Sequence, residues 1–262
     1  ALGLALGATS WWISVPLMLL AAMLAGAAWA FIPALLKARI GAHEVITTMM
    51  FTYIGRYFVS YLVNGPMKEP GNIPQTPALD PSAQLPRIAT LFSEGAREAL
   101  PILNLGRAHM GIFVALIAAV VIWLILKYTT LGFENRAVGF NRWASETAGI
   151  SVQWTTVKAL CISGVLAGLA GATEVMGVHH RLFDQFSSGF GFTGIAVALL
   201  AKNHPLGVIP AALLFGALSA GATTMQFEAK VPQDIIQIIQ ALVIFCVAAA
   251  ESVLWFVRRR QQ

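Results

Sequence analysis

The sequence predicts an all-α protein, a polytopic bundle of hydrophobic helices that crosses a membrane several times. Hydrophobic residues make up 57% of the 262 residues and charged residues only 11%, whereas a typical soluble domain has about 25% charged residues. Apolar runs near the ~20 residues that a membrane span needs recur along the chain. We therefore expect membrane lipid to surround a single domain over residues 1–262.

The apolar runs justify the elements in chain order, and all but one are long enough to span. We expect spans over Val15–Leu36, Val45–Val63, Met110–Leu126, Val157–Val178, Leu206–Met225 and Ile235–Val257, with a short broken segment over Phe190–Ala201. The opening run, Ala1–Ala8, has no preceding basic region and is expected to be the end of a span whose beginning is missing.

A long segment over residues 64–107 interrupts the apolar pattern. Its first half is rich in proline, with Pro66, Pro70, Pro74, Pro77, Pro81 and Pro86. Proline lacks a backbone donor and breaks helices, so this segment cannot lie exposed to hydrocarbon. We expect it to form an extracytoplasmic loop.

The basic residues predict the orientation of the spans. If the terminal Arg258–Arg260 lie in the cytoplasm, alternating crossings place three short loops on the same side. These are Lys37–His43, Lys127–Thr156 and Lys202–Pro205, and they carry an excess of Lys and Arg. We therefore expect the C-terminus in the cytoplasm. The basic residues are scattered and form no stripe, which argues against nucleic-acid binding despite a net charge of +5.

Two features of the spans concern packing. Small residues recur at a spacing of four in Ala22, Gly26 and Ala30 and again in Gly164, Gly168 and Ala172, which favours close helix packing. Gly189, Gly191 and Gly194 fit a G-x-G-x-x-G pattern, but their membranous context lacks the strand and acidic residue of a dinucleotide site. This glycine-rich stretch is interpreted as a break in a membrane segment.

No pattern for enzyme chemistry is found in the chain. There is no G-x-x-x-x-G-K-[ST] run, so any ATP that drives this protein must bind another subunit. Neither His43–Glu44 nor His179–His180 has the spacing of a zinc site. We expect no catalytic residue, cofactor or metal. Glu174 and Glu251 are acidic residues within apolar spans, and such residues are costly there, so Glu174 is a candidate for a polar pathway.

The loop over residues 127–156 is long enough to hold a short amphipathic helix outside the membrane. Ala137, Phe140, Ala144 and Ala148 fall at helical spacing on one side. Such a helix can rest on lipid headgroups or dock into a groove of a partner protein. Phe140 and Trp143 suit either use, and the physical argument leaves both open.

Three stretches resemble the permeases of bacterial ABC importers for branched-chain amino acids, sugars and nucleosides. Arg136–Gly139 with Asn141 and Ala144–Ile150 is similar to the coupling-helix segment of that superfamily. His43–Ile54 resembles its Asn-Glu-Val-Ile stretch, and Gly189–Leu200 with Asn203–Gly207 resembles the nucleoside and simple-sugar branch. The resemblance covers nearly the whole chain.

This resemblance implies a permease subunit in the bacterial inner membrane, without enzyme activity of its own. The expected partners are cytoplasmic ATP-binding subunits, a second permease subunit in a homo- or heterodimer, and an extracytoplasmic substrate-binding lipoprotein. It also implies that the coupling segment over residues 127–156 contacts the ATP-binding subunit through Arg136, Gly139, Asn141, Ala144, Ala148 and Gly149.

The solute expected from the resemblance is a nucleoside or a related simple sugar. Candidate pathway residues are Glu174, Phe190, Phe192, Thr193 and Tyr53, because aromatic rings can stack on a base and polar groups can orient a ribose. The alternatives are a permease for another small solute, such as a branched-chain amino acid, or a secondary transporter.

Overall fold

The structure is a computed structural model that describes residues 11–88, 108–184, 186–187, 189–230, 235, 238–239, 241–242 and 245. Its described residues divide into two compact units. One unit comprises Ala1–Ala118 with Leu124–Phe186, and the other comprises Ala119–Trp123 with Ser187–Gln262. Every described element is a helix, apart from two isolated bridges.

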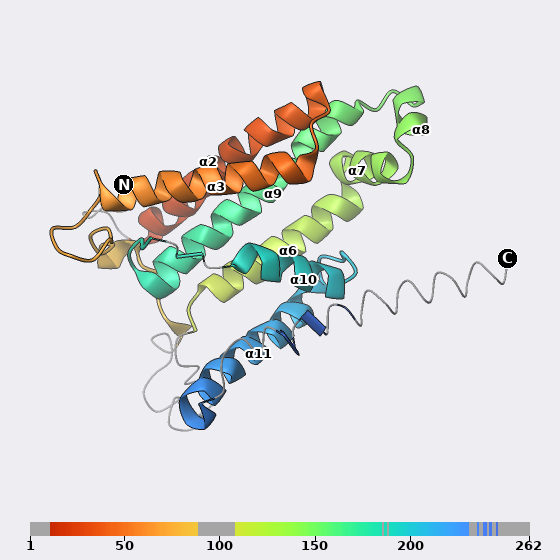
Figure 1. The fold of residues 1–262 in the computed structure, drawn as a ribbon. Coiled ribbons are helices and arrows are strands. Elements are labelled where there is room, and N and C mark those ends of the chain that lie inside the picture. Colours follow the sequence, from red (N-terminus) through yellow and green to blue (C-terminus); the bar gives the residue numbers. More distant parts are fainter. Residues whose placement is uncertain are drawn as a thin grey trace. The chain divides into compact units, whose positions relative to one another are not determined.

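The first unit is built around two long helices, α2 (Trp11–Ile40) and α9 (Val152–Glu174), which lie side by side in Figure 1. The two predicted stripes of small residues meet at this contact. A Cβ atom on Gly26 would collide with the carbonyl oxygen of Gly164, and one on Gly164 would lie 2.5 Å from the Cβ of Ala30. The helix backbones therefore approach as closely as small residues permit.

A third helix, α3 (Glu44–Asn64), packs along α2 in the same unit. The Trp29 ring of α2 lies 6.0 Å from the Phe51 ring and 6.2 Å from the Phe58 ring, measured between centroids. Lys37 and Glu44 form an ion pair of 3.3 Å where the two helices are joined. Both side chains of that pair are well exposed, so it adds little stability.

Helix α9 ends in an unusual way. After Glu174 the chain continues as one π-helical turn, η3 (Val175–His179), and His180 then adopts a left-handed conformation with φ of 55°. Segment 75–88, which includes the short helix η1 (Pro81–Ala83), runs back over this turn. Three of its amides, those of Thr76, Leu79 and Leu85, donate to carbonyl groups at the end of α9.

Three more helices lead from this unit into α9. Helix α6 (Gly111–Tyr128) turns at Thr129 into α7 (Thr130–Phe140), and α8 (Arg142–Thr147) follows after a single residue. The sequence predicts one amphipathic helix in this stretch, and that expectation is wrong because Asn141 interrupts the helix. Asn141 is extended, with φ of −155°, and its side chain accepts a hydrogen bond of 3.1 Å from the amide of Ala144.

The second unit holds α10 (Phe190–Leu200) and α11 (Val208–Ala229), which pack on each other. Ala196 and Val197 of α10 and Ala211 and Phe215 of α11 form its buried cluster. Helix α10 has only 11 residues, as predicted for the short segment, and is too brief to cross a bilayer as a straight helix.

Four helices in the described part of the chain are long and apolar enough to cross a membrane: α2, α6, α9 with η3, and α11. They coincide with four of the predicted spans. Helix α3 matches a fifth but is more polar and is not one of the four. The predicted span over Ile235–Val257 lies mostly outside the described residues.

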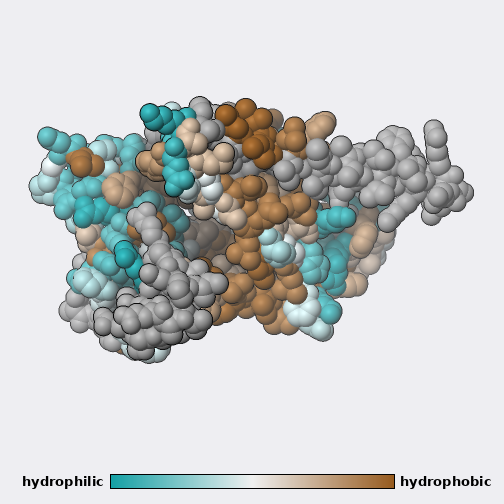
Figure 2. Space-filling view, turned by 90° about the horizontal axis from the view of Figure 1, so that it is seen from below, coloured by the Kyte–Doolittle hydropathy of each residue, from teal (hydrophilic) through white to brown (hydrophobic). Residues whose placement is uncertain are grey.

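The surface of these helices suits a lipid environment. Hydrophobic side chains such as Leu24 of α2, Ile117 of α6 and Leu213 of α11 are exposed. Figure 2 shows hydrophobic residues, in brown, covering much of one face of the protein, with hydrophilic residues, in teal, gathered in patches beside them. Such broad apolar areas would be unusual on a soluble monomer. The chain is a multi-pass membrane protein.

Candidate functional site

Glu174, a predicted pathway residue, lies at the last position of α9 and has a close partner. Its carboxylate oxygen is 3.4 Å from Nε2 of His179, at the other end of the π-helical turn, and about a third of each side chain is exposed. The pair carries opposite charges only when His179 is protonated. Glu174 therefore braces the π-helical turn, which is a structural role that the sequence alone leaves open.

His109 is a second histidine at this end of the unit, and the sequence analysis does not single it out. Its Nδ1 accepts a hydrogen bond of 3.1 Å from the amide of Gly111, the first residue of α6. This bond requires a ring that is unprotonated at Nδ1. Burial lowers the pKa of His109, the carboxylate of Glu174 opposes that shift, and His180 adds to it.

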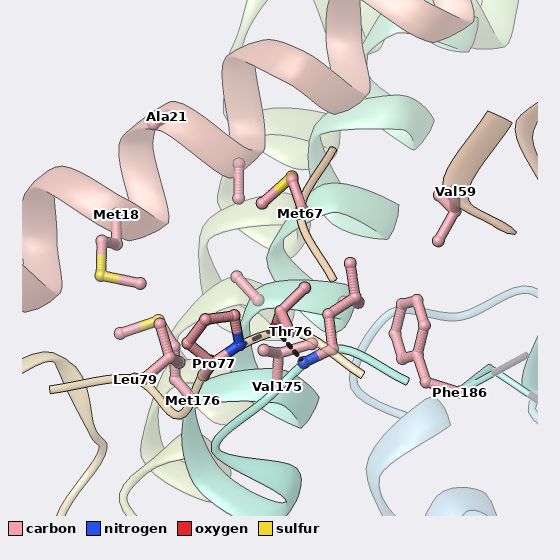
Figure 3. Close-up of a pocket in the computed structure, with 14 residues that line it drawn as sticks. Met18, Ala21, Val59, Met67, Thr76, Pro77, Leu79, Val175, Met176 and Phe186 are labelled. Carbon is pink, nitrogen blue, oxygen red and sulfur yellow. Dashed lines mark hydrogen bonds between the residues drawn. The ribbon is translucent and has the colours of Figure 1, made fainter. Parts of the chain in front are cut away.

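A cavity of about 380 Å³ lies between α2, α3, the proline-rich segment and the end of α9 (Figure 3). Its walls are apolar apart from Thr76, whose hydroxyl donates to Pro77 and accepts from the amide of Leu182. The lining side chains labelled in Figure 3 include Met18, Val59, Met67, Leu79 and Phe186. No predicted pathway residue lines this cavity, and its apolar walls do not suit a polar solute.

Tyr53 lies on α3 with 55% of its surface exposed. It points away from α2, because the ring contacts with Trp29 are made by Phe51 and Phe58 on the other side of the helix. Glu174 and Tyr53 belong to the first unit.

Phe190, Phe192 and Thr193 begin α10 in the second unit. Gly189 precedes them with φ of +86°, a conformation that favours glycine. The rings of Phe190 and Phe192 are exposed, while the hydroxyl of Thr193 donates to the carbonyl of Gly189 over 3.4 Å. The structure thus gathers these three predicted residues in one exposed helical turn of a unit that Glu174 and Tyr53 do not share.

The predicted coupling residues all lie on α7, on α8 or at their ends. Arg136 and Gly139 are on α7, and Arg136 donates to the carbonyl of Leu126 at the end of α6. Asn141 caps α8, which contains Ala144, and Ala148 ends it. Gly149 then turns the chain toward α9 with φ of +81°.

Two hydrophobic side chains project from the helices α7 and α8. Phe140 is 89% exposed and Trp143 is 76% exposed. Beneath them, Ser145 is buried and its hydroxyl donates to the carbonyl of Asn141 over 2.9 Å. Lys158 of α9 pairs with Glu134 of α7 at 3.3 Å. The exposed rings therefore sit on a local framework of caps and polar contacts, which suits a docking surface.

Several positioning residues are missed by sequence reasoning. The hydroxyl of Ser60 on α3 donates to a carboxylate oxygen of Asp184 over 3.1 Å, across 124 positions of sequence. Lys158 and Glu134 likewise come from separate helices. No local periodicity could reveal such pairs, since each member alone is an ordinary polar residue.

The chain matches one protein family over residues 1–248, and that family is described as branched-chain amino acid transport system / permease component. A guanosine ABC transporter permease protein of Bacillus subtilis is 40% identical over 243 residues, which cover 92% of this chain and 67% of that protein.

Two further relatives show similar agreement. A glucose ABC transporter permease protein of Haloferax volcanii is 37% identical, over 90% of this chain and 62% of its own length. A nucleoside ABC transporter permease protein of Lactococcus lactis is 36% identical, over 90% of this chain and 64% of its own length. The chain thus spans about two thirds of the length of these relatives, and no solved structure matches it.

Proposed function

The chain belongs to the family of branched-chain amino acid transport system permease components, and from that premise we propose that it is the permease subunit of an ATP-driven importer. Its solute is a nucleoside or a related simple sugar. The observation that carries this proposal is the 36–40% identity, over at least 90% of the chain, to permeases named for guanosine, glucose and nucleosides. These solutes share a hydroxylated sugar ring.

The permease lies in the bacterial inner membrane with its C-terminus in the cytoplasm. The excess of Lys and Arg in short loops supports this orientation. Residues 127–156, which hold α7 and α8, then lie in the cytoplasm, and segment 64–107 lies outside. The apolar surfaces of α2, α6, α9 and α11 face lipid or neighbouring helices.

ATP hydrolysis takes place in a separate cytoplasmic subunit that docks on α7 and α8. Phe140 and Trp143 enter a groove of that subunit, a role favoured by their high exposure on a framework held by Asn141 and Ser145. The residues that shape this surface are Arg136, Gly139, Asn141, Ala144, Ala148 and Gly149. Docking on a protein partner is thereby preferred to resting on lipid headgroups.

The translocation pathway forms where this chain meets a second permease subunit, and an extracytoplasmic binding lipoprotein delivers the solute. Tyr53, Phe190, Phe192 and Thr193 line the pathway, which is consistent with their exposed side chains. Glu174 remains a candidate for the outer end of the pathway, although its pairing with His179 gives it a structural role as well.

Uptake by cells tests the solute. A bacterial strain that lacks this permease is complemented with the complete protein and supplied with labelled guanosine, glucose or leucine. We expect restored uptake of guanosine or glucose and none of leucine. Restored uptake of leucine alone would overturn the solute and favour the branched-chain amino acid alternative.

A further inference from the structure

Helix α3 is unlike the other long helices of the described part. It has 21 residues, enough to cross a bilayer, yet it is not among the four helices that are apolar enough to do so. Arg56 lies near its middle and is exposed. A charged residue at such a position faces water or a polar partner, because burying it in hydrocarbon is costly.

The polar residues of α3 fall on one face. Tyr53, Arg56, Tyr57, Ser60 and Asn64 are spaced at i, i+3, i+4, i+7 and i+11, which places them along one side of a helix. We refer to these five residues as the polar face of α3. Tyr57 is 71% exposed, and its ring is about 6 Å along the helix from that of Tyr53, at 1.5 Å per residue.

The side of α3 that packs on α2 has a different composition. Phe51 and Phe58 contact the ring of Trp29, and a Cβ atom on Gly55 would lie 3.4 Å from the same ring. These three residues have the spacing i, i+4 and i+7. The packing of α3 in this unit therefore turns the polar face away from α2.

A carboxylate adjoins one end of the polar face. One oxygen of Asp184 accepts a hydrogen bond of 3.1 Å from Ser60, and the amide of Asn64 donates to the carbonyl of Ser60. The other oxygen of Asp184 is buried and has no hydrogen-bond partner among the residues that the structure describes. Such an oxygen raises the free energy of the folded state until a donor reaches it.

We propose that the polar face of α3 lines the aqueous translocation pathway, with Asp184 at its end as an acceptor for the hydroxyl groups of the solute's sugar ring. The inference rests on the proposed function and names the group that the pathway recognises. Tyrosine rings give a flat surface for a sugar or a base, and a carboxylate accepts from vicinal hydroxyls. Lipid cannot satisfy Arg56 and the tyrosine hydroxyls in this way.

Accessibility of single cysteines tests the water-filled path. In the assembled transporter, with Cys161 and Cys246 replaced by serine, Tyr57→Cys is compared with Phe58→Cys. The two positions are adjacent on α3, but Phe58 stacks on Trp29. We expect a small charged thiol reagent to modify the Tyr57→Cys variant, and saturating guanosine to slow that reaction about tenfold, as a bound solute shields the site. Phe58→Cys should show no such protection.

Ser60→Cys gives a second variant of nearly unchanged size, so that a failure of Tyr57→Cys to assemble does not decide the matter. Absence of modification at both positions in transporters that still import would overturn the proposal and indicate that a protein partner covers the face. The reagent reports on water access even if guanosine is not the solute, so the proposed function and this inference can fail separately.

Competition by modified nucleosides tests Asp184. Wild-type transporter should prefer guanosine to 2′,3′-dideoxyguanosine by about tenfold, since one hydrogen bond to a charged group is worth roughly that much in affinity. Asp184→Asn should lose most of this preference, whereas Glu228→Gln, at an exposed position of α11, should keep it. An unchanged preference in Asp184→Asn would remove Asp184 from the site.

Discussion

At the scale of single residues, His109 links two elements of the first unit. Its Nδ1 caps the start of α6 through the amide of Gly111, and its ring fills the space beside Gly177, where any added Cβ atom would meet it. The groups that face it are Glu174 at the end of α9, His180 after η3, and Arg87 across an isolated bridge. The contact needs the neutral ring, so the stability of this end of the unit depends on pH.

We expect the unfolding temperature of the detergent-solubilised protein to fall in mildly acidic solution. Burial lowers the pKa of His109 below its ordinary value of 6.5, so its contribution is complete above that value. It is lost as pH falls from there through the lowered pKa of the folded state. His109→Gln, which cannot titrate, should reduce this pH dependence. Equal pH profiles for the two proteins would exclude His109 as the source.

At the scale of elements, the contact between α2 and α9 depends on the absence of side chains. Gly26, Gly164 and Gly168 let the two backbones meet, and an added Cβ atom at any of them would collide with the facing helix. Gly171 lies on the same helix as Gly164, yet a Cβ atom there would meet nothing within 4 Å. The two glycines of α9 therefore form a matched pair.

Gly164→Ala should destabilise the protein, whereas Gly171→Ala should be neutral or slightly stabilising. The first change forces the two helices apart, at a cost of about 1–3 kcal/mol for overpacking, while the second only restricts the unfolded chain. Thermal unfolding in detergent measures both. A Gly164→Ala protein as stable as wild type would mean that α2 and α9 do not pack as closely as the structure indicates.

The helices α7 and α8 form the element most directly tied to the proposed partner. A side chain at Gly139 would enter open space, so Gly139→Glu should not disturb folding but should place a charge on the docking surface. We expect normal membrane insertion with loss of most ATP-driven uptake. Gln153→Glu adds the same charge at an exposed position of α9 and should retain uptake. Wild-type uptake in Gly139→Glu would remove Gly139 from the coupling surface.

The sequence predicts some elements better than others, for physical reasons. Spans such as α2 and α11 are foreseen because hydropathy is a local property, and the docking of Gly26 on Gly164 follows from matching stripes of small residues. The break at Asn141 is missed because the apolar spacing from Ala137 to Ala148 continues through it, while only a side-chain cap interrupts the helix.

The site is less predictable than the fold. Tyr53 is found from its residue type, but the rest of the polar face needs knowledge of which side of α3 packs on Trp29. The bond between Ser60 and Asp184 spans 124 positions, and that between Leu182 and Thr76 spans 106. Such contacts depend on tertiary packing, so no local pattern announces them.

At the scale of the whole molecule, the chain divides its work among distinct surfaces. Apolar helices suit the bilayer, a polar face on α3 suits a hydrated solute, and two exposed rings on α7 and α8 suit a cytoplasmic partner. A member of this permease family with such surfaces needs an external source of energy. A secondary carrier would instead need ion-coupling residues within its spans.

The energy source is therefore the most direct test of the account. The complete transporter, with its ATP-binding subunit, is reconstituted into liposomes, binding protein and labelled guanosine are added outside, and ATP is enclosed inside or omitted. We predict uptake that requires enclosed ATP and persists when the proton gradient is dissipated. Uptake without ATP that follows an imposed proton gradient would contradict the account.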